Sequence, residues 1–503
     1  MSDLSATLLP SPSTTPADAQ LIVRIARIPV EHPAQTLSLH ELLPADIDGT
    51  QAWFGHSRRM VGWGEAARIT VVGPHAIRDA ARTWDDLRGS ARVECVCTPA
   101  CADDEMPALP LAFGSFGFSA TTPGFLIVPD VAVIEMPAGN DDTPHSTTAL
   151  WGTDWGGLGP ARGTRYVVTT QVARGEAGSV KSTAHEKGAD SASAAAQTSS
   201  NDATSTGLDA PSLNDPLAVL DAALATRTAV APNAPEGITT APGRMTQAQW
   251  MASVSEVIEL LRAGAASKVV MSRDMVVQSP TPIDPRFLLE RLTTLYPTTW
   301  AYAVEGLIGA TPEMLAAMHG GQVSSRVLAG TTSPGEGEAL MSSMKDRTEH
   351  MFAVESVARA LAPITQTLDV PEVPQVLDLP NVSHLATDVT ATLASGNVLD
   401  VIAALHPTAA VCGTPTKLAF DILERFESTE RGRYSGPVGW VDGAGEGEFG
   451  IALRCGQLSE AGRRLTILAG GGIMPDSIPE AELRETRAKM APLLQALGMS
   501  IAG

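Results

Sequence analysis

Two acidic stretches of the chain place carboxylates near the start of a predicted helix. Glu349 lies in "MKDRTEHMFAVESVARAL", and Glu482 and Glu485 lie in "PEAELRET". Residues three apart share one helix face, so Glu482 and Glu485 point in the same direction. Carboxylates at a helix N-terminus commonly pair with the helix dipole. Two such helices that converge would instead form a Mg2+ site, because Mg2+ takes one or two carboxylates plus substrate oxygens. The spacing alone leaves both interpretations open.

A second group of reactive residue types lies in the segment 405–427, which reads "LHPTAAVCGTPTKLAFDILERFE". Cys412 and His406 could form a nucleophile and its base, or the loop could shape a ligand cavity. A reactive thiolate needs an electropositive neighbourhood, and the adjacent Val411 and Gly413 provide none. We therefore predict that Cys412 packs in the core, that His406 begins a turn, and that the loop borders a cavity for a small ligand.

Lys268 stands at the head of "KVVMSRDMVV", a β-branched run typical of a strand. A lysine there is either a solvated charge or a base. The glycines of "LAGGGI" predict a close approach of the backbone to a ligand, and this run lacks the P-loop pattern. The cysteines of "CVCTPAC" (95–101) have no second Cys or His pair nearby, so we do not expect a metal site there.

The elements that position these residues can be read from the same sequence. Thr246 and Gln249 form a capping-box pattern at the start of a helix that should end at Gly264. The segment "GPVGWVDGAGEGEFGIALRC" predicts a β-hairpin with a glycine-acid loop, and "GFLIVPDVAVIEM" predicts two strands. Residues 1–172 give few chemical signals. The segment 173–216 is rich in Ala, Ser, Thr and Asp, which predicts a disordered insertion, and residues 217–503 carry most of the motifs.

The net charge of -21 restricts the possible partners. An acidic surface repels nucleic acid and anionic membranes, so neither is an expected partner. The N-terminus has no basic n-region, and no apolar run reaches the roughly 20 residues that cross a bilayer. We expect a soluble, cytoplasmic protein, with the monomer as the expected state. An anionic substrate would need local cations or a metal.

Ten motifs occur in a fixed order between about residues 245 and 500. They are "KVVMSR", "GATPEML", "LAGTT", "KDRTEH", "VSHLAT", "LHPTAAVCGTP", "RGRYSGPVGWVD", "IALRC", "LAGGGI" and "PEAELRET". In this order they resemble the catalytic region of the chorismate-utilising enzymes, namely the anthranilate, aminodeoxychorismate, isochorismate and salicylate synthases. The resemblance implies an α+β fold with large, mainly antiparallel sheets flanked by helices. It also implies that the N-terminal segment completes the same core as one intertwined unit.

The resemblance also implies roles for individual residues. Lys268 matches the general base and Glu313 the general acid. The positions that match substrate-binding residues are Gly330, Thr331, His384, Ala410, Tyr434, Arg454, Gly470, Gly472 and Lys489. Glu349 and Glu485 match Mg2+ ligands, and Glu482 lies near them. Gly471 departs from the family pattern, which usually has alanine there.

Within the family, Lys268 separates two chemistries. Members that add water carry a lysine at this position, because water is a weaker nucleophile than ammonia and needs a base. Amine-adding members lack it and depend on a glutamine amidotransferase. The resemblance therefore favours an isochorismate synthase, which adds water at C2 of chorismate and releases the C4 hydroxyl. Ala410 stands where salicylate synthases, which also eliminate pyruvate, tend to have threonine. Salicylate synthase stays as the alternative, followed by a chorismate-binding protein without activity. The sequence does not indicate whether the product enters menaquinone, siderophore or salicylate synthesis.

Overall fold

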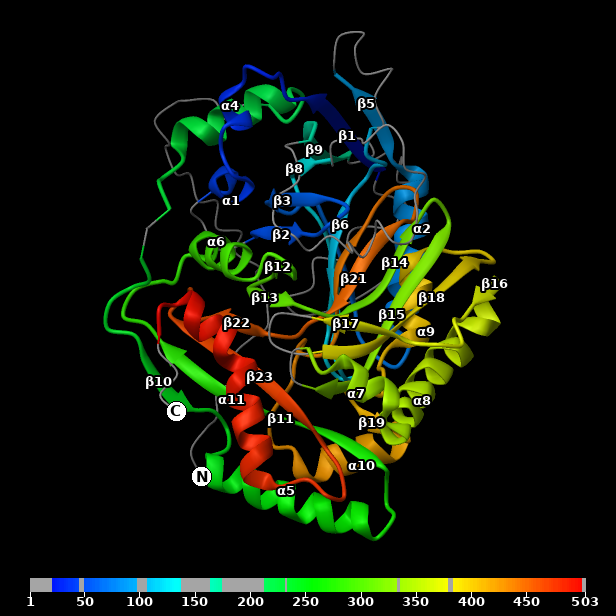
Figure 1. Ribbon diagram of the computed structural model, residues 1–503. Coiled ribbons are helices and arrows are strands. Elements are labelled where there is room, and N and C mark those ends of the chain that lie inside the picture. The colour runs from blue at the N-terminus through cyan, green and yellow to red at the C-terminus, as the bar shows by residue number, and fades with distance from the viewer. Residues whose placement is uncertain are drawn as a thin grey trace, which may run out of the picture.

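The computed structural model describes residues 20–44, 49–96, 106–136, 163–173, 212–230, 233–332, 335–378 and 383–499, without the side chains of Thr331, Lys345, Glu349 and Asp378. Two large sheets and the helices around them make up this part of the chain (Figure 1). Apart from the parallel pair β1–β5, the strand pairs are antiparallel. The predicted α+β class with mainly antiparallel sheets is confirmed.

The larger sheet contains thirteen strands within the described residues. Their order is β10 (Thr239–Pro242), β11 (Lys268–Gln278), β23 (Arg464–Ile473), β22 (Cys455–Ser459), β13 (Leu307–Thr311), β12 (Trp300–Val304), β2 (Gln51–Phe54), β3 (Arg59–Trp63), β8 (Val131–Glu135), β9 (Arg165–Ala173), β1 (Gln20–Arg27) and β5 (Arg92–Cys95), with the short β19 (Gly413–Thr414) also on β11.

The smaller sheet contains ten strands within the same described ranges. Their order is β16 (Thr365–Asp369), β18 (Ser383–Leu393), β15 (Gln322–Thr332), β14 (Met314–His319), β21 (Gly447–Ile451), β20 (Pro437–Val441), β6 (Ala112–Ser115), β7 (Gly124–Val128) and β4 (Ala67–Val71), with β17 (Gln375–Asp378) also on β18. The predicted hairpin is β20–β21, and the two strands predicted around Pro129 are β7 and β8.

Strands from the N-terminal segment extend both sheets. In the larger sheet β2 pairs with β12, and in the smaller sheet β6 pairs with β20. The indole Nε1 of Trp53 on β2 donates to Glu448 on β21 at 2.9 Å, so one buried hydrogen bond links the two sheets. Because the neighbouring strands come from both halves of the chain, neither half contains a complete sheet.

Helices cover the sheets and carry several predicted site residues. The described helices are α1 (Leu39–Leu42), α2 (Ala76–Ser90), α4 (Pro216–Thr226), α5 (Gln247–Arg262), α6 (Pro285–Leu295), α7 (Gly337–Ser342), α8 (Met344–Leu361), α9 (Val398–Leu405), α10 (Thr416–Phe426) and α11 (Pro479–Ala496). In Figure 1, α11, in red, crosses β23, and it also contacts α5 and α6. α8 packs on β15 and β18 of the smaller sheet. Among the described residues, no helix combines the length and apolar composition needed to cross a membrane.

The helix predicted over 246–264 illustrates how local sequence sets these elements. The Thr246 hydroxyl accepts from the Gln249 amide and the Gln249 side chain accepts from the Thr246 amide, which completes the predicted capping box. Trp250 and Val254 are fully buried on one face of α5. Gly264, at φ 83°, follows the helix end in the left-handed conformation that favours glycine.

The predicted insertion 173–216 overlaps ordered residues at both ends. Residues 174–211 lie outside the described residues, whereas Ala173 ends β9 and residues 212–216 lead into α4. Asp215 caps this helix by accepting from the amides of Leu217 and Ala218. Amino-acid composition does not reveal these local hydrogen bonds. The predicted C-terminal end of the insertion therefore lies too far along the chain.

Replacing residues 174–211 with about eight Gly/Ser residues should leave the fold intact. The Thr169 hydroxyl donates to the Leu213 carbonyl at 2.7 Å, so the two flanks already lie close together, and eight residues extend up to about 28 Å. Shortening the 38-residue loop lowers its closure cost by about 1 kcal/mol, so Tm should stay the same or rise by a few degrees. Calorimetry measures this, and a fall in Tm of more than about 5 °C would show that the segment contributes to the core.

Candidate active site

Strands β11 and β23 form the floor of the site. Side chains alternate between the two faces of a strand, so Lys268 and Val270 lie on the same face of β11. Val270 pairs with Gly472 on β23. A Cβ on Gly472 would lie 2.7 Å from Cε of Lys268, too close for any real contact. Glycine at 472 is therefore required for the Lys268 side chain to lie across β23.

Beyond Leu468, β23 has an open edge. β22 pairs with β23 only over the residues 464–468, so Gly470 and Gly472 have β11 as their only neighbouring strand within the described residues. The Val270 amide donates to the Cys412 carbonyl, away from β23. When the main-chain groups of one residue in an antiparallel pair point away from the partner strand, the groups of the residue opposite it point away from the first strand. The N–H groups of Gly470 and Gly472 accordingly face the open edge.

The side chain of Lys489 occupies part of this edge. Its Nζ donates to the Gly470 carbonyl at 2.9 Å and contacts Glu485 Oε1 at 2.6 Å. Lys489 and Glu485 are one turn apart on α11, so the helix brings both to the end of β23.

Glu313 lies in the turn between β13 and β14. Its carbonyl accepts from the Ile451 amide at 2.9 Å, which fixes the turn against β21. Burial raises the pKa of the Glu313 carboxyl, and the nearby cations Arg454, Lys489 and Lys268 oppose part of this rise. The four side chains therefore share one electrostatic environment. A carboxyl with a raised pKa in such a place can act as a proton donor.

Tyr434 and Arg454 approach the open edge from the side of the smaller sheet. Tyr434 is 5% exposed, and burial raises its pKa to about 12, so its hydroxyl stays neutral and can donate. A Cβ on Gly470 would stand 3.3 Å from this hydroxyl. Burial lowers the pKa of Arg454, while Tyr434, Glu313 and Glu485 counteract the effect. A phenol, a guanidinium and free amides together suit a carboxylate ligand.

The acidic residues of α11 test whether a divalent cation fits. Ser477 donates to Oε1 of Glu482 at 2.7 Å, but the buried Oε2 has no partner among the described residues. Burial raises the pKa of Glu482, and the negative charge of Glu485 adds to the rise. A Cβ on Gly471 would lie 2.8 Å from Glu482 Oε2, so the glycine that departs from the family pattern makes room for this oxygen.

A buried carboxylate oxygen without a donor, beside a second carboxylate, fits a Mg2+ ion. Glu349 belongs to α8, but its side chain lies outside the described residues. The described residues contain no group of three His, Cys, Asp or Glu side chains that could hold a metal. Any metal site in this region therefore depends on Glu349 or on substrate oxygens.

His384 and Gly330 come together across β15 and β18. A bulge between Ala329 and Thr331 interrupts the pairing, and Gly330 adopts φ 76° within it. Nδ1 of His384 donates to the Gly330 carbonyl at 3.3 Å. Burial lowers the pKa of His384, so the ring is a neutral group. The side chain of Thr331 lies outside the described residues.

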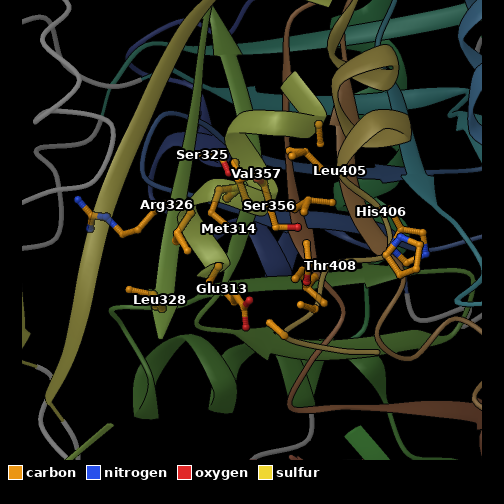
Figure 2. A pocket seen from close by; sticks show the side chains of 18 of the residues that line it. Glu313, Met314, Ser325, Arg326, Leu328, Ser356, Val357, Leu405, His406 and Thr408 are labelled. Carbon is orange, nitrogen blue, oxygen red and sulfur yellow. The ribbon is translucent and has the colours of Figure 1, made fainter. Parts of the chain in front are cut away.

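A cavity of about 160 Å3 lies next to Glu313, between α8, the strands β14 and β15, the end of α9 and the loop 406–410. Figure 2 shows the Glu313 carboxylate at its lower end and the hydroxyl groups of Ser356 and Thr408 along its wall. Arg326 points away from the cavity toward Asp388, with which it forms an ion pair. Ala410 also borders the cavity, as the sequence predicted for this loop.

The prediction that Cys412 packs in the core is confirmed. The residue is fully buried, and burial raises the pKa of its thiol to about 12, which removes it as a nucleophile. His406 does not act on it: its ring contacts Phe118 edge-on at 6.3 Å between centroids. Burial lowers the pKa of His406 to about 4.

Sequence analysis missed the buried pair Glu427 and Arg431. Two bonds join the guanidinium and the carboxylate, at 2.6 and 2.8 Å. Their i,i+4 spacing was visible in "ERFESTERGR", but this spacing usually describes a surface pair on a helix. Only the fold shows that both side chains lie against β11.

The chain is similar to several known proteins. The family model described as "Chorismate binding enzyme" matches residues 196–498. The isochorismate synthase DhbC of Bacillus subtilis is 38% identical over 267 residues, 49% of this chain and 67% of that protein. The salicylate biosynthesis isochorismate synthase of Pseudomonas aeruginosa is 36% identical over 262 residues, 50% of this chain and 54% of that protein. The solved structure of MenF, the menaquinone-specific isochorismate synthase from Escherichia coli, has the same fold, with a TM-score of 0.66 at 21% identity over 95% of this chain and 94% of that one.

The chain belongs to the chorismate-binding enzyme family, because the family model covers more than half of its residues. The resemblance drawn from the ten motifs is confirmed.

His406→Gln should reduce the sensitivity of the fold to acid. A histidine held neutral by burial stabilises the fold fully above its unfolded pKa of about 6.5, and this stability is lost as pH falls toward the folded pKa of about 4. The loss amounts to as much as about 3 kcal/mol. Denaturant unfolding at pH 7 and pH 4.5 measures it, and an equal loss in wild type and variant would exclude His406 as the source.

Proposed function

We propose that this chain is an isochorismate synthase, which converts chorismate to isochorismate in the presence of Mg2+. The main support is that Lys268, Arg454 and Lys489 all act electrostatically on the buried Glu313 carboxyl. Water addition with loss of a hydroxyl group needs a base for the water and an acid for the leaving oxygen. Lys268 and Glu313 are residues of these two types in one cationic environment. The names of the relatives DhbC and MenF point to the same reaction.

In the proposed reaction, the neutral amine of Lys268 accepts a proton from water as the water oxygen bonds to C2. The ring double bonds shift, and the bond between C4 and its hydroxyl oxygen breaks. Glu313 in its protonated form, which burial favours by raising its pKa, donates its proton to that oxygen, which leaves as water. One water enters and one leaves, and the proton gained by Lys268 equals the proton lost by Glu313.

The remaining groups bind and orient the substrate. Arg454, the Tyr434 hydroxyl and the open-edge amides of Gly470 and Gly472 are the donors for the enolpyruvyl carboxylate. Bound Mg2+, held by Glu482 and Glu485 with Glu349, would supply positive charge to the ring carboxylate. Local cations of this kind are required because a chain of net charge -21 otherwise repels a dianion.

Lys268→Ala should separate binding from chemistry. Wild type with chorismate and Mg2+ should form isochorismate without equivalent pyruvate. The variant should lose about 100-fold or more in kcat, the scale of a missing general base. Its Kd for chorismate should change little, because Arg454 and Tyr434 remain. Product chromatography, a pyruvate-coupled assay and calorimetric binding measure these three quantities.

Lys268→Arg serves as the matched control and should not restore turnover, since a guanidinium stays protonated. A near-normal kcat in Lys268→Ala would reject lysine as the base. Pyruvate equal to chorismate consumed by wild type would instead assign a salicylate synthase. Binding without any product would assign a chorismate-binding protein that lacks activity.

Glu485→Gln should weaken metal binding. Loss of one carboxylate from a site with few protein ligands should raise the Kd for Mn2+, used as a probe for Mg2+, by about 10-fold or more. EDTA should abolish turnover, and added Mg2+ should restore it. Glu480→Gln, an exposed carboxylate on the first turn of the same helix, is the control and should bind Mn2+ as wild type does. Equal Mn2+ affinity in both variants, or full activity in EDTA, would remove the proposed site.

A further inference from the structure

The edge of β11 that faces away from β23 lacks a continuous neighbour. β19 pairs with Lys268 and Val269, and β10 pairs with the residues 275–278. Between them, Val270 and Ser272 turn their main-chain groups toward side chains and loops. Buried main-chain groups need partners, so whatever supplies those partners fixes the strand that begins with Lys268.

Glu427 and Arg431 supply two of these four partners, and the Cys412 carbonyl and the Trp250 indole supply the other two. Arg431 Nη2 donates to the Val270 carbonyl at 2.5 Å. The Ser272 amide donates to Glu427 Oε2 at 2.7 Å, and the Ser272 hydroxyl donates to Oε1 at 2.8 Å. The ion pair thus takes the place of a neighbouring strand along this part of β11. We call Glu427 and Arg431 the β11 clamp.

The same guanidinium also holds the loop that borders the cavity. Arg431 Nη1 donates to the Val411 carbonyl at 2.8 Å, one residue after Ala410. Its guanidinium carbon lies 4.0 Å from the ring centroid of Phe118, in the N-terminal segment. The side chains of Arg431 and Glu427 are only 4% and 5% exposed. One buried cation therefore connects the strand of Lys268, the loop of Ala410 and the N-terminal segment.

Burial of an ion pair is a weak source of stability, since the desolvation cost of two charges offsets their attraction. The geometry points to another use. We propose that the β11 clamp is a positioning pair for the reaction: it holds Lys268 and the loop 408–411 in a fixed relation across the substrate. The clamp thereby governs both the rate of water addition and whether isochorismate is released intact. This inference rests on the proposed function.

Two variants test the clamp, Arg431→Lys and Glu427→Gln. In each variant the new side chain can still form a hydrogen bond, but it cannot form both of the bonds that join the guanidinium to the carboxylate. Because a misplacement of about 1 Å can cost 100-fold in rate, we expect kcat to fall about 10-fold to 100-fold. The chorismate KM should stay within about 3-fold, since Arg454, Tyr434 and the β23 amides lie on the other strand edge. Pyruvate released per isochorismate should rise at least about 3-fold as the loop beside Ala410 loosens.

The ratio of pyruvate to isochorismate distinguishes positioning from stability, because it does not depend on how many molecules are folded. Glu430→Gln is the matched control: Glu430 adjoins Arg431 but forms an exposed pair with Arg244, with side chains 70% and 57% exposed. It should behave as wild type. If Arg431→Lys fails to fold, Glu427→Gln and the milder Ser272→Ala test the proposal. Both should change kcat and the ratio of pyruvate to isochorismate in the same direction, by a smaller amount.

If Glu427→Gln has the kcat and the product ratio of wild type, the proposed positioning role of the clamp is wrong. The role is also wrong if kcat falls only in proportion to the loss of folded protein and the product ratio does not change. Either result leaves the proposed function intact if wild type makes isochorismate and Lys268→Ala does not. If wild type itself releases pyruvate stoichiometrically, the proposed function fails. The clamp is then judged by kcat per folded molecule, which it predicts will still fall.

Discussion

The end of the β22 pairing at Leu468 is the constraint on which the site depends. Main-chain donors inside a protein must find partners, and β23 continues past this point without a strand on one side. Its glycine run offers N–H groups to a ligand and leaves space for Lys268 and Glu482 on opposite faces. A larger residue at 471 or 472 would force the end of the Glu482 or Lys268 side chain to move, so the glycines allow both side chains their observed positions.

At the other edge of the strand pair β11–β23, main-chain groups also lack a neighbouring strand, but there they bind groups of the protein. The main-chain groups of Val270 and Ser272 bind Glu427, Arg431, the Cys412 carbonyl and the Trp250 indole. The two edges therefore differ, since protein groups close the edge of β11, whereas β23 has no neighbouring strand beyond Leu468 other than β11 among the described residues. In this strongly acidic chain, Lys268, Arg454 and Lys489 all act electrostatically on Glu313, so positive charge is concentrated near that carboxyl.

The family resemblance and much of the local structure could be predicted from sequence. The capping box of α5, the hairpin β20–β21 and the packing role of Cys412 depend on neighbours within a few residues, and all three agree with the structure. The boundary near 173–216 was placed less well, because Asp215 caps a helix through two backbone bonds that composition cannot reveal. The roles of Glu349 and Thr331 stay predictions, since their side chains lie outside the described residues.

The sequence by itself determined which residue types were present in which order, and this order was enough to indicate the family and to predict residues for its site. It could not show that three cations act on the Glu313 carboxyl, that one buried oxygen of Glu482 has no hydrogen-bond donor among the described residues, or that Arg431 joins three distant segments. Those properties arise from contacts between residues up to hundreds of positions apart, such as Trp53 with Glu448. Burial and the pairing of main-chain groups depend on the whole fold, so the tertiary structure alone decides them.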